Sequence, residues 1–276
     1  MKTVEFPDGT TVPALGQGTW MMGEARGRRA DEIAALQAGL DLGLTVIDTA
    51  EMYADGEAER VVGDAIAHRR DEVFLVSKAY PQNASRARLR QACEASCKRL
   101  RTDRLDLYLL HWRGSVSLAE TVEAMEALVA AGLIARWGVS NLDTDDMVEL
   151  EAVGGRTCMT DQILYNLTRR GPEFGLIPWL GQRAIPVMAY SPVEQGRLLG
   201  HRALAQIAAE HGVSPAQVAL AWLLRQPGIL AIPKASSLPH VRDNRAALDL
   251  DLTADDITLL DRSFPAPTKR RPLEML

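Results

Sequence analysis

Eight short apolar runs alternate with longer amphipathic segments along most of this 276-residue chain. Most of these runs are apolar on both faces, which is typical of parallel strands that helices cover on both sides. The alternation therefore predicts repeated strand–helix units and a largely parallel sheet. The runs span residues 15–20, 45–48, 73–78, 105–111, 134–141, 160–166, 185–192 and 229–234.

The intervening segments carry signals for the start and the end of a helix. Ser117 and Glu120 have the spacing of a capping box, and Gly132 stands where that helix would end. Ser214 and Gln217 repeat the capping-box spacing in a later segment. These signals predict helices that begin and end between the apolar runs.

A hairpin followed by eight strand–helix units predicts a (β/α)8 TIM barrel with an N-terminal β-hairpin. Residues 2–6 and 10–15 flank an Asp-Gly turn, which is a strong hairpin signal. The alternative is an open doubly wound sheet, whose first strand usually leads through GxGxxG into a helix. Residues 15–23 read LGQGTWMMG, which lacks that spacing. We therefore expect a barrel, as one domain spanning residues 1–276.

Composition and charge exclude several classes of function. The net charge of −5 gives no reason to expect nucleic acid or an anionic membrane as a partner. No apolar run is long enough for a membrane span, and the first residues lack the apolar core of a signal peptide. The three cysteines show no zinc-ligand spacing, so we expect no metal. We expect a cytoplasmic protein that is a monomer or a weak oligomer.

Polar residues stand at the ends of several apolar runs. In barrel enzymes the active site lies at the carboxyl ends of the strands. Asp48, Lys78 and His111 end the second, third and fourth runs, and Tyr53 follows Asp48 by five residues. Each residue alone has an ordinary structural explanation, but a barrel would bring all four to one mouth.

These four side chains suit the protonation of a carbonyl oxygen. Tyr53 could donate the proton, and a nearby Lys78 ammonium would favour the phenolate and lower the pKa of Tyr53. Asp48 could balance the charge of Lys78, and His111 could orient the carbonyl oxygen. No side chain can donate hydride, so a nicotinamide or flavin cofactor is required.

Seven motifs in order resemble the aldo-keto reductase family over essentially the whole chain. The chain is most similar to short bacterial members, such as reductases of methylglyoxal or 2,5-diketo-D-gluconate. The motifs are VIDTAEMY, LVSK, DLYLLHW, GVSN, QILYN, AYSP and IPKASS.

The resemblance implies a catalytic set of Asp48, Tyr53, Lys78 and His111, with Tyr53 as the general acid. It also implies NADPH, extended across the barrel mouth without a Rossmann fold. The cofactor-binding residues expected from it are Gly18, Thr19, Trp20, Asp48, Ser140, Asn141, Gln162, Tyr190, Ser191, Pro192, Lys234, Ser236, Ser237, His240 and Asn244. The expected substrate pocket consists of Trp20, Tyr53, His111 and Trp112.

Within that set, the resemblance implies more specific roles. Ser140, Asn141 and Gln162 match residues that hydrogen-bond the nicotinamide carboxamide. Tyr190 matches the aromatic ring that stacks on the nicotinamide, and Ser191 matches a pyrophosphate contact. Lys234 and Ser237 match contacts to the 2′-phosphate, and Asn244 matches an adenine contact.

One departure from the family pattern concerns cofactor preference. Many members have an arginine six residues after the lysine matched by Lys234, and this chain has His240 there. Arginine is a permanently charged bidentate phosphate ligand, whereas a neutral histidine binds phosphate poorly. Arg242 is close in sequence. We therefore expect a preference for NADPH that is weaker than in members with the arginine, with NADH as a poorer cofactor.

A second departure concerns the loops around the mouth. After residue 200 the chain enters a helix at once, and the tail after Phe264 is short. In relatives these regions fold over the cofactor or shape the substrate pocket. We therefore expect an open, permissive site that reduces several small aldehydes and 2-oxoaldehydes to alcohols.

Two other functions are compatible with parts of the pattern. The chain could be an NADPH-binding, redox-sensing subunit with little turnover, which would bind cofactor without oxidising it. It could also be a barrel lyase or aldolase that forms a Schiff base through Lys78, although the cofactor motifs would then be unexplained.

Overall fold

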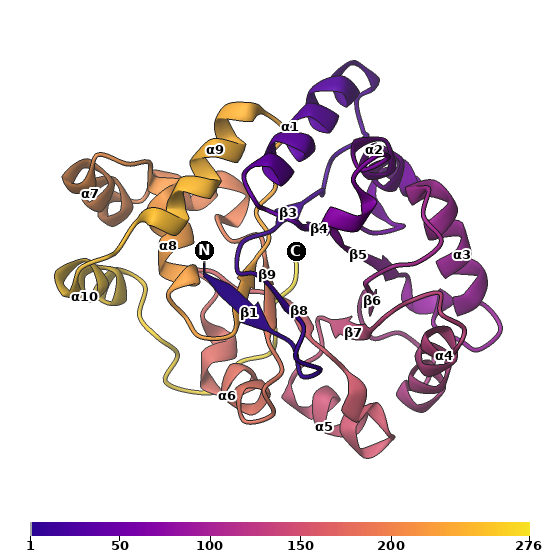
Figure 1. Cartoon of the computed structure of the whole chain (residues 1–276). Coiled ribbons are helices and arrows are strands. Elements are labelled where there is room, and N and C mark those ends of the chain that lie inside the picture. The colour runs from indigo at the N-terminus through magenta and orange to yellow at the C-terminus, as the bar shows by residue number, and fades with distance from the viewer. Residues whose placement is uncertain (1) are drawn as a thin grey trace.

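The computed structural model describes residues 2–276, in which eight parallel strands form a ring with helices around the outside (Figure 1). Each strand falls on one of the eight apolar runs, so the predicted barrel is confirmed. The strands are β3 (Gln17–Gly18), β4 (Val46–Asp48), β5 (Phe74–Ala79), β6 (Leu107–Leu110), β7 (Trp137–Ser140), β8 (Asp161–Leu164), β9 (Val187–Tyr190) and β10 (Ile229–Ala231).

The ring closes where the first run meets the segment after β10. The strands are neighbours in sequence order from β3 to β10, and isolated bridges join Leu15 to Ala231 and Gly18 to Lys234. The Gly18 N–H also donates to the Pro233 carbonyl at 3.0 Å. A Cβ atom at Gly18 would lie 2.7 Å from the Ile232 carbonyl oxygen. Glycine thus permits the close approach of backbones that seals the barrel.

Ten α-helices of the described chain connect or follow the strands. They are α1 (Arg29–Asp41), α2 (Glu57–Ala65), α3 (Leu89–Leu100), α4 (Leu118–Ala130), α5 (Thr144–Ala152), α6 (Leu176–Gly181), α7 (Arg202–His211), α8 (Pro215–Leu224), α9 (Leu238–Ala246) and α10 (Ala254–Ser263). Short 3-10 turns that matter for the site are η1 (Arg26–Arg28), η2 (Tyr53–Gly56) and η7 (Glu194–Gly200).

The predicted helix caps are confirmed at one helix and half confirmed at another. At α8, Ser214 and Gln217 form a complete capping box. At α4, Ser117 accepts from the Glu120 N–H at 3.3 Å, but the reciprocal half of the box is missing. The Glu120 carboxylate accepts a hydrogen bond from the Arg86 N–H at 3.1 Å instead. A contact with a neighbouring loop has therefore replaced the local one.

The N-terminal hairpin covers the amino end of the barrel, where Figure 1 shows β1 in front of the ring. Strands β1 (Thr3–Glu5) and β2 (Thr11–Pro13) pair antiparallel, as predicted. Phe6 stacks on Phe74, the first residue of β5, with ring centroids 5.4 Å apart. The hairpin therefore leaves the carboxyl ends of the strands uncovered as the mouth of the barrel. Residues 2–276 include no helix that is long and apolar enough to cross a membrane.

Candidate functional site

The mouth holds a buried ion pair between two strand ends. Asp48 ends β4 and Lys78 lies near the end of β5, and the Nζ of Lys78 donates to Asp48 Oδ2 at 2.7 Å. The other carboxylate oxygen of Asp48 accepts from Gln162 Nε2 of β8 at 2.8 Å. Lys78 is fully buried, so this pairing balances a charge that water does not reach.

Tyr53 returns to this pair through a tight turn. Residues 49–51 stay beside β5, since the Thr49 N–H donates to the Val76 carbonyl at 2.9 Å. Beyond Tyr53 the backbone is left-handed at Ala54, Asp55 and Gly56, where φ is 49°, 52° and 85°. This run of positive φ turns the chain from the mouth into α2, and strained backbone of this kind is common at functional sites.

The hydrogen bonds of Lys78 determine where the Tyr53 proton can go. Lys78 Nζ donates to Asp48, to the Thr49 carbonyl at 2.9 Å and to Tyr53 Oη at 3.1 Å. An ammonium has three protons, so all of them are engaged. The Tyr53 oxygen therefore accepts from Lys78, and its own proton is left for an acceptor in the mouth.

The pKa values of Lys78 and Tyr53 are set by burial, by the contact between the two side chains and by the charge of Asp48. Burial lowers the pKa of Lys78, but attraction to Asp48 and Tyr53 more than offsets it, so the pKa is raised and Lys78 is charged. Burial raises the pKa of Tyr53 by more than Lys78, as predicted, lowers it, so the net shift is upward. Tyr53 is protonated at neutral pH, as a proton donor must be.

His111 follows β6, and its ring and that of Trp20 both pack against Tyr53. Its ring centroid is 5.8 Å from that of Tyr53, and the Trp20 ring meets Tyr53 edge-on at 5.0 Å. Burial, and then the charge of Lys78, lower the pKa of His111 to about 2. The imidazole is therefore neutral, and its buried Nδ1 has no partner in the described chain.

Aromatic side chains form the wall of the mouth. The predicted pocket residue Trp112 lies 4.8 Å from His111, and Tyr80 meets Trp112 at 5.9 Å in an edge-on arrangement. Trp20 is 41% exposed, so it has a free face toward solvent. Tyr80 was missed because it follows Lys78 in a loop, where apolar periodicity gives no information about direction.

The next strand ends form one hydrogen-bonded group. Asn141, left-handed at φ 60°, donates to the His111 carbonyl at 3.1 Å and to Ser140 Oγ at 3.0 Å. Its side-chain oxygen accepts from Tyr190 Oη at 3.0 Å, and Ser140 Oγ donates to the Gln162 carbonyl at 2.8 Å. The structure thus brings Ser140, Asn141, Gln162 and Tyr190 together beside the catalytic candidates.

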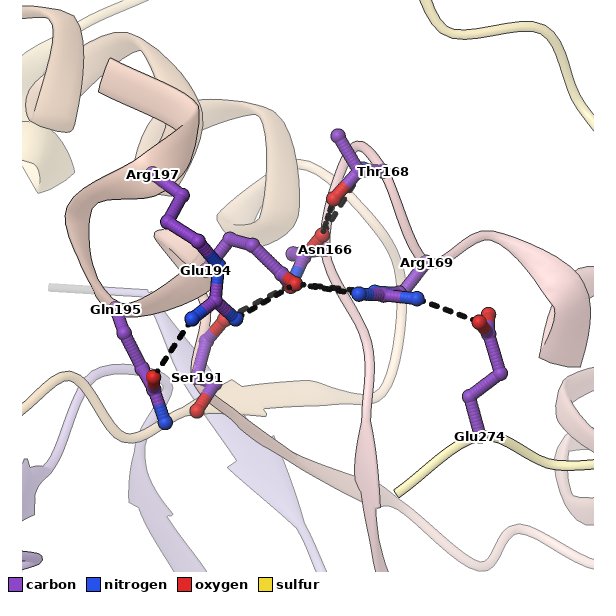
Figure 2. A network of polar contacts seen from close by, with 8 residues as sticks. All are labelled: Asn166, Thr168, Arg169, Ser191, Glu194, Gln195, Arg197 and Glu274. Atoms are coloured by element: carbon purple, nitrogen blue, oxygen red, sulfur yellow. Dashed lines mark hydrogen bonds and ion pairs between the residues drawn. The ribbon is translucent and has the colours of Figure 1, made fainter. Parts of the chain in front are cut away.

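Hydrogen bonds and ion pairs to a buried carboxylate hold the loop after β9 in place (Figure 2). Glu194 is 4% exposed and accepts from Asn166 at 2.8 Å, from Arg169 at 2.7 Å and from Arg197 at 3.0 Å. Asn166 also donates to the Ser191 carbonyl at 2.9 Å. The predicted contact residues Ser191 and Pro192 therefore lie in a loop of fixed shape, and neither Asn166 nor Glu194 was foreseen.

The same network holds the C-terminal tail. Arg169 donates to Glu274 at 2.5 Å, as Figure 2 shows, and burial raises the pKa of Tyr190, an effect that the nearby backbone of Leu276 partly offsets. Although the tail is short, it comes back to the mouth and meets the side chain expected to stack on a cofactor.

Beyond β10, two cations meet at one hydroxyl. Lys234 Nζ lies 3.2 Å from Ser236 Oγ, and Arg28 Nη2 of η1 lies 2.9 Å from the same oxygen. Arg28 belongs to the RGRR segment, which carries no strand-end signal, so the sequence did not indicate it.

The remaining residues that were predicted to bind the cofactor make fewer side-chain contacts with one another. Thr19 is buried and donates to the Asp48 carbonyl at 2.9 Å, and Gly18 belongs to the seam that closes the barrel. Ser237 precedes α9 without capping it by its side chain, and His240 is exposed on α9. Neither the His240 nor the Asn244 side chain makes a hydrogen bond or ion pair within the described residues, although both residues belong to α9.

A hollow of about 250 Å³ lies away from this chemistry, at the other end of the barrel. Pro7, Leu150, Trp179 and Ile185 line it, and Arg183 there is paired with Glu151 at 3.0 Å. Within residues 2–276, no group of three or more His, Cys, Asp or Glu side chains is placed to hold a metal ion. The mouth, where buried polar groups converge, is therefore the candidate active site.

Comparisons with known proteins agree with this geometry. The chain is 52% identical over 281 aligned residues to methylglyoxal reductase YeaE of Escherichia coli (strain K12), and the match covers 100% of this chain and 99% of that protein. It is 32% identical to glyoxal reductase of Bacillus subtilis (strain 168), over 94% of this chain and 91% of the relative.

Solved structures and a family model place the chain among the same class of enzymes. An aldo/keto reductase from Klebsiella pneumoniae, crystallised with NADP and acetate, is 54% identical and superposes with a TM-score of 0.98, covering 100% of this chain and 99% of that one. The sequence model of the aldo/keto reductase family matches residues 14–264. The chain therefore belongs to the aldo/keto reductase family.

Proposed function

We propose that this chain uses NADPH to reduce small aldehydes and 2-oxoaldehydes, such as methylglyoxal, to alcohols. Relatives named methylglyoxal reductase and glyoxal reductase support the substrate class, and the NADP-bound relative supports the cofactor. The observation that carries the proposal is the contact at 3.1 Å in which Lys78 donates to Tyr53 and leaves the Tyr53 proton available.

Each catalytic candidate has a distinct task in this reaction. A bound nicotinamide would supply the hydride to the carbonyl carbon. His111, held neutral by burial, donates a hydrogen bond that orients the carbonyl oxygen, and Tyr53 transfers its proton to that oxygen. Lys78 stabilises the phenolate that remains, and Asp48 keeps Lys78 in place and balances its charge.

The residues at the mouth fit the cofactor. Arg28 and Lys234 lie together, and neither is ion-paired to a carboxylate within residues 2–276, so the place suits a phosphate dianion. The group around Asn141 offers amide and hydroxyl partners for a carboxamide, beside the aromatic ring of Tyr190. We assign cofactor contacts to Trp20, Ser140, Asn141, Gln162, Tyr190, Ser191, Pro192, Lys234, Ser236, Ser237 and Asn244.

The geometry does not favour a Schiff base on Lys78. A lysine must be neutral to attack a carbonyl, and the raised pKa of Lys78 keeps it charged. Its three protons are also engaged by Asp48, Thr49 and Tyr53. Borohydride trapping of a covalent adduct with an aldehyde should therefore fail.

Replacing Tyr53 by Phe tests the assignment of the acid. The variant keeps the ring but has no proton to donate, so kcat for methylglyoxal should fall roughly 10²–10⁴-fold. NADPH affinity, measured by fluorescence titration, should change by less than about threefold. Tyr80→Phe is the matched control, since Tyr80 lies in the same aromatic wall without touching Lys78.

Two results would contradict this proposal. Normal turnover by Tyr53→Phe would remove Tyr53 from the mechanism. Stoichiometric NADPH binding by the wild type, with no oxidation of NADPH across a panel of small aldehydes, would favour a sensing subunit instead.

We further propose that residues 1–276 act as one domain, as a monomer or weak oligomer, with a permissive pocket. A single urea transition and a monomer mass in solution would support the first part. High KM values across several small aldehydes would support the second, and a sub-micromolar KM for one sugar would contradict it.

A further inference from the structure

Arg28 and Lys234 form a cationic pair around Ser236, and the segments that carry them are far apart in sequence. Arg28 ends η1, just before α1, whereas Lys234 and Ser236 follow β10. The seam of the barrel brings them together, because Gly18 bridges to Lys234 and α1 packs beside α9. In Figure 1, α1 and α9 lie next to each other at this side of the ring.

The hydrogen bonds leave the Ser236 proton free of both cations. Arg28 Nη2 at 2.9 Å and Lys234 Nζ at 3.2 Å can only donate, so Ser236 Oγ accepts from both. A hydroxyl has two lone pairs and one proton, so the Ser236 proton points elsewhere. Three donors from two segments therefore face one small region.

The charges of this pair are not balanced by neighbouring groups. Partial burial, and then repulsion by Arg28, lower the pKa of Lys234, while the attraction of Glu32 and Glu24 is weaker. The buried carboxylate of Glu32 is engaged by the Gly23 N–H at 3.0 Å. No carboxylate of the described chain lies within ion-pair distance of Arg28 or Lys234. A dianion would relieve the repulsion and take all three donors.

We propose that Arg28 is a specificity-determining residue that binds the 2′-phosphate of NADPH, in the role that His240 leaves unfilled. This inference rests on the proposed use of NADPH. The guanidinium comes from η1 rather than from α9, and with Lys234 and Ser236 it selects the phosphorylated ribose. Because arginine is charged at all physiological pH values, the preference for NADPH does not depend on protonation of His240.

Binding of two nucleotide fragments to the full chain tests this role without any turnover. The probes are 2′,5′-ADP and 5′-AMP, titrated calorimetrically; they differ only by the 2′-phosphate. Arg28→Gln should raise the Kd for 2′,5′-ADP about tenfold, the usual cost of losing a charge-assisted hydrogen bond, and leave the Kd for 5′-AMP within about twofold. Arg28→Lys should recover part of the loss.

Two neighbouring residues give matched controls. Arg26→Gln removes the same charge from the same exposed turn, and His240→Gln removes the residue at the family position. Both should leave the Kd for 2′,5′-ADP within about twofold. All three positions are exposed, so the variants should fold, which circular dichroism can verify.

The outcomes separate this inference from the proposed function. An unchanged Kd in Arg28→Gln, an equal loss in Arg26→Gln, or a loss only in His240→Gln would overturn the role of Arg28. A wild type that does not prefer 2′,5′-ADP to 5′-AMP would overturn it too, even if the enzyme reduced aldehydes. If the tenfold effect appears but no aldehyde is reduced, Arg28 keeps its role and the proposed reaction fails.

Discussion

At the scale of single residues, charge balance at the mouth depends on Lys78. Its ammonium is compensated by Asp48, and it in turn acts on two neighbours in different ways. It partly offsets the effect of burial on Tyr53, whereas it adds to the effect of burial on His111. One buried cation thus favours a phenol that can lose its proton next to an imidazole that stays neutral.

The low pKa of His111 predicts a stability change with pH. The folded protein binds a proton at His111 only near pH 2, while the unfolded chain binds it near pH 6.5. Lowering the pH from 7 to 5 therefore favours unfolding, by up to about 2 kcal/mol from this residue. His111→Gln should lose correspondingly less stability between pH 7 and pH 5 in urea unfolding.

The comparison uses the difference in the free energy of unfolding between pH 7 and pH 5. Any cost of the substitution that is the same at both pH values therefore cancels. His68→Gln, on the surface, is the control and should follow the wild type. If His111→Gln and the wild type lose the same free energy of unfolding on acidification, the imidazole is not held neutral in the folded protein.

At the scale of elements, strand ends could be predicted and loop contacts could not. Asp48, Lys78 and His111 were placed correctly because parallel strands bring their carboxyl ends to one edge. Tyr80, Arg28 and the Glu194 network escaped prediction because they depend on how loops cross between distant segments. The net upward shift of the Tyr53 pKa could not be predicted either, because it depends on how deeply the side chain is buried.

The loop after β9 should depend on Glu194 for its shape. Glu194→Gln removes the charge that Arg169 and Arg197 share, and an amide cannot accept from both arginines and Asn166 as the carboxylate does. We expect a loss of about 1–3 kcal/mol in the free energy of unfolding. Hydrogen exchange should also become faster in residues 191–200 and 270–276.

Arg197→Gln is the control for this network. Its side chain is 55% exposed, so the loss should stay within about 0.5 kcal/mol. Equal effects of the two substitutions would mean that the buried carboxylate is not the centre of the network. Unchanged exchange in the tail would mean that the contact between Arg169 and Glu274 does not hold it.

At the scale of the whole molecule, the seam between β3 and β10 both completes the barrel and assembles the proposed phosphate site. The seam has only a two-residue strand on one side, and it is reinforced by backbone bonds from Gly16 to Ala231 and from Gly18 to Pro233. The same bridge holds Lys234 at the seam, and Arg28 meets it there because both donate to Ser236. Closure of the fold and selection of the cofactor are thereby linked through Gly18.

Gly18→Ala should weaken the closure of the barrel. The added Cβ would lie 2.7 Å from the Ile232 carbonyl oxygen, and backbone on both sides must move apart to admit it. We expect a loss of about 1–3 kcal/mol in urea unfolding, and weaker binding of 2′,5′-ADP because Lys234 shifts with the seam. Gly181→Ala, with open space around it, should change stability by less than about 0.5 kcal/mol. Weaker binding with an unchanged urea midpoint would show that Gly18 serves the nucleotide directly, as the family resemblance implies, rather than the closure of the ring.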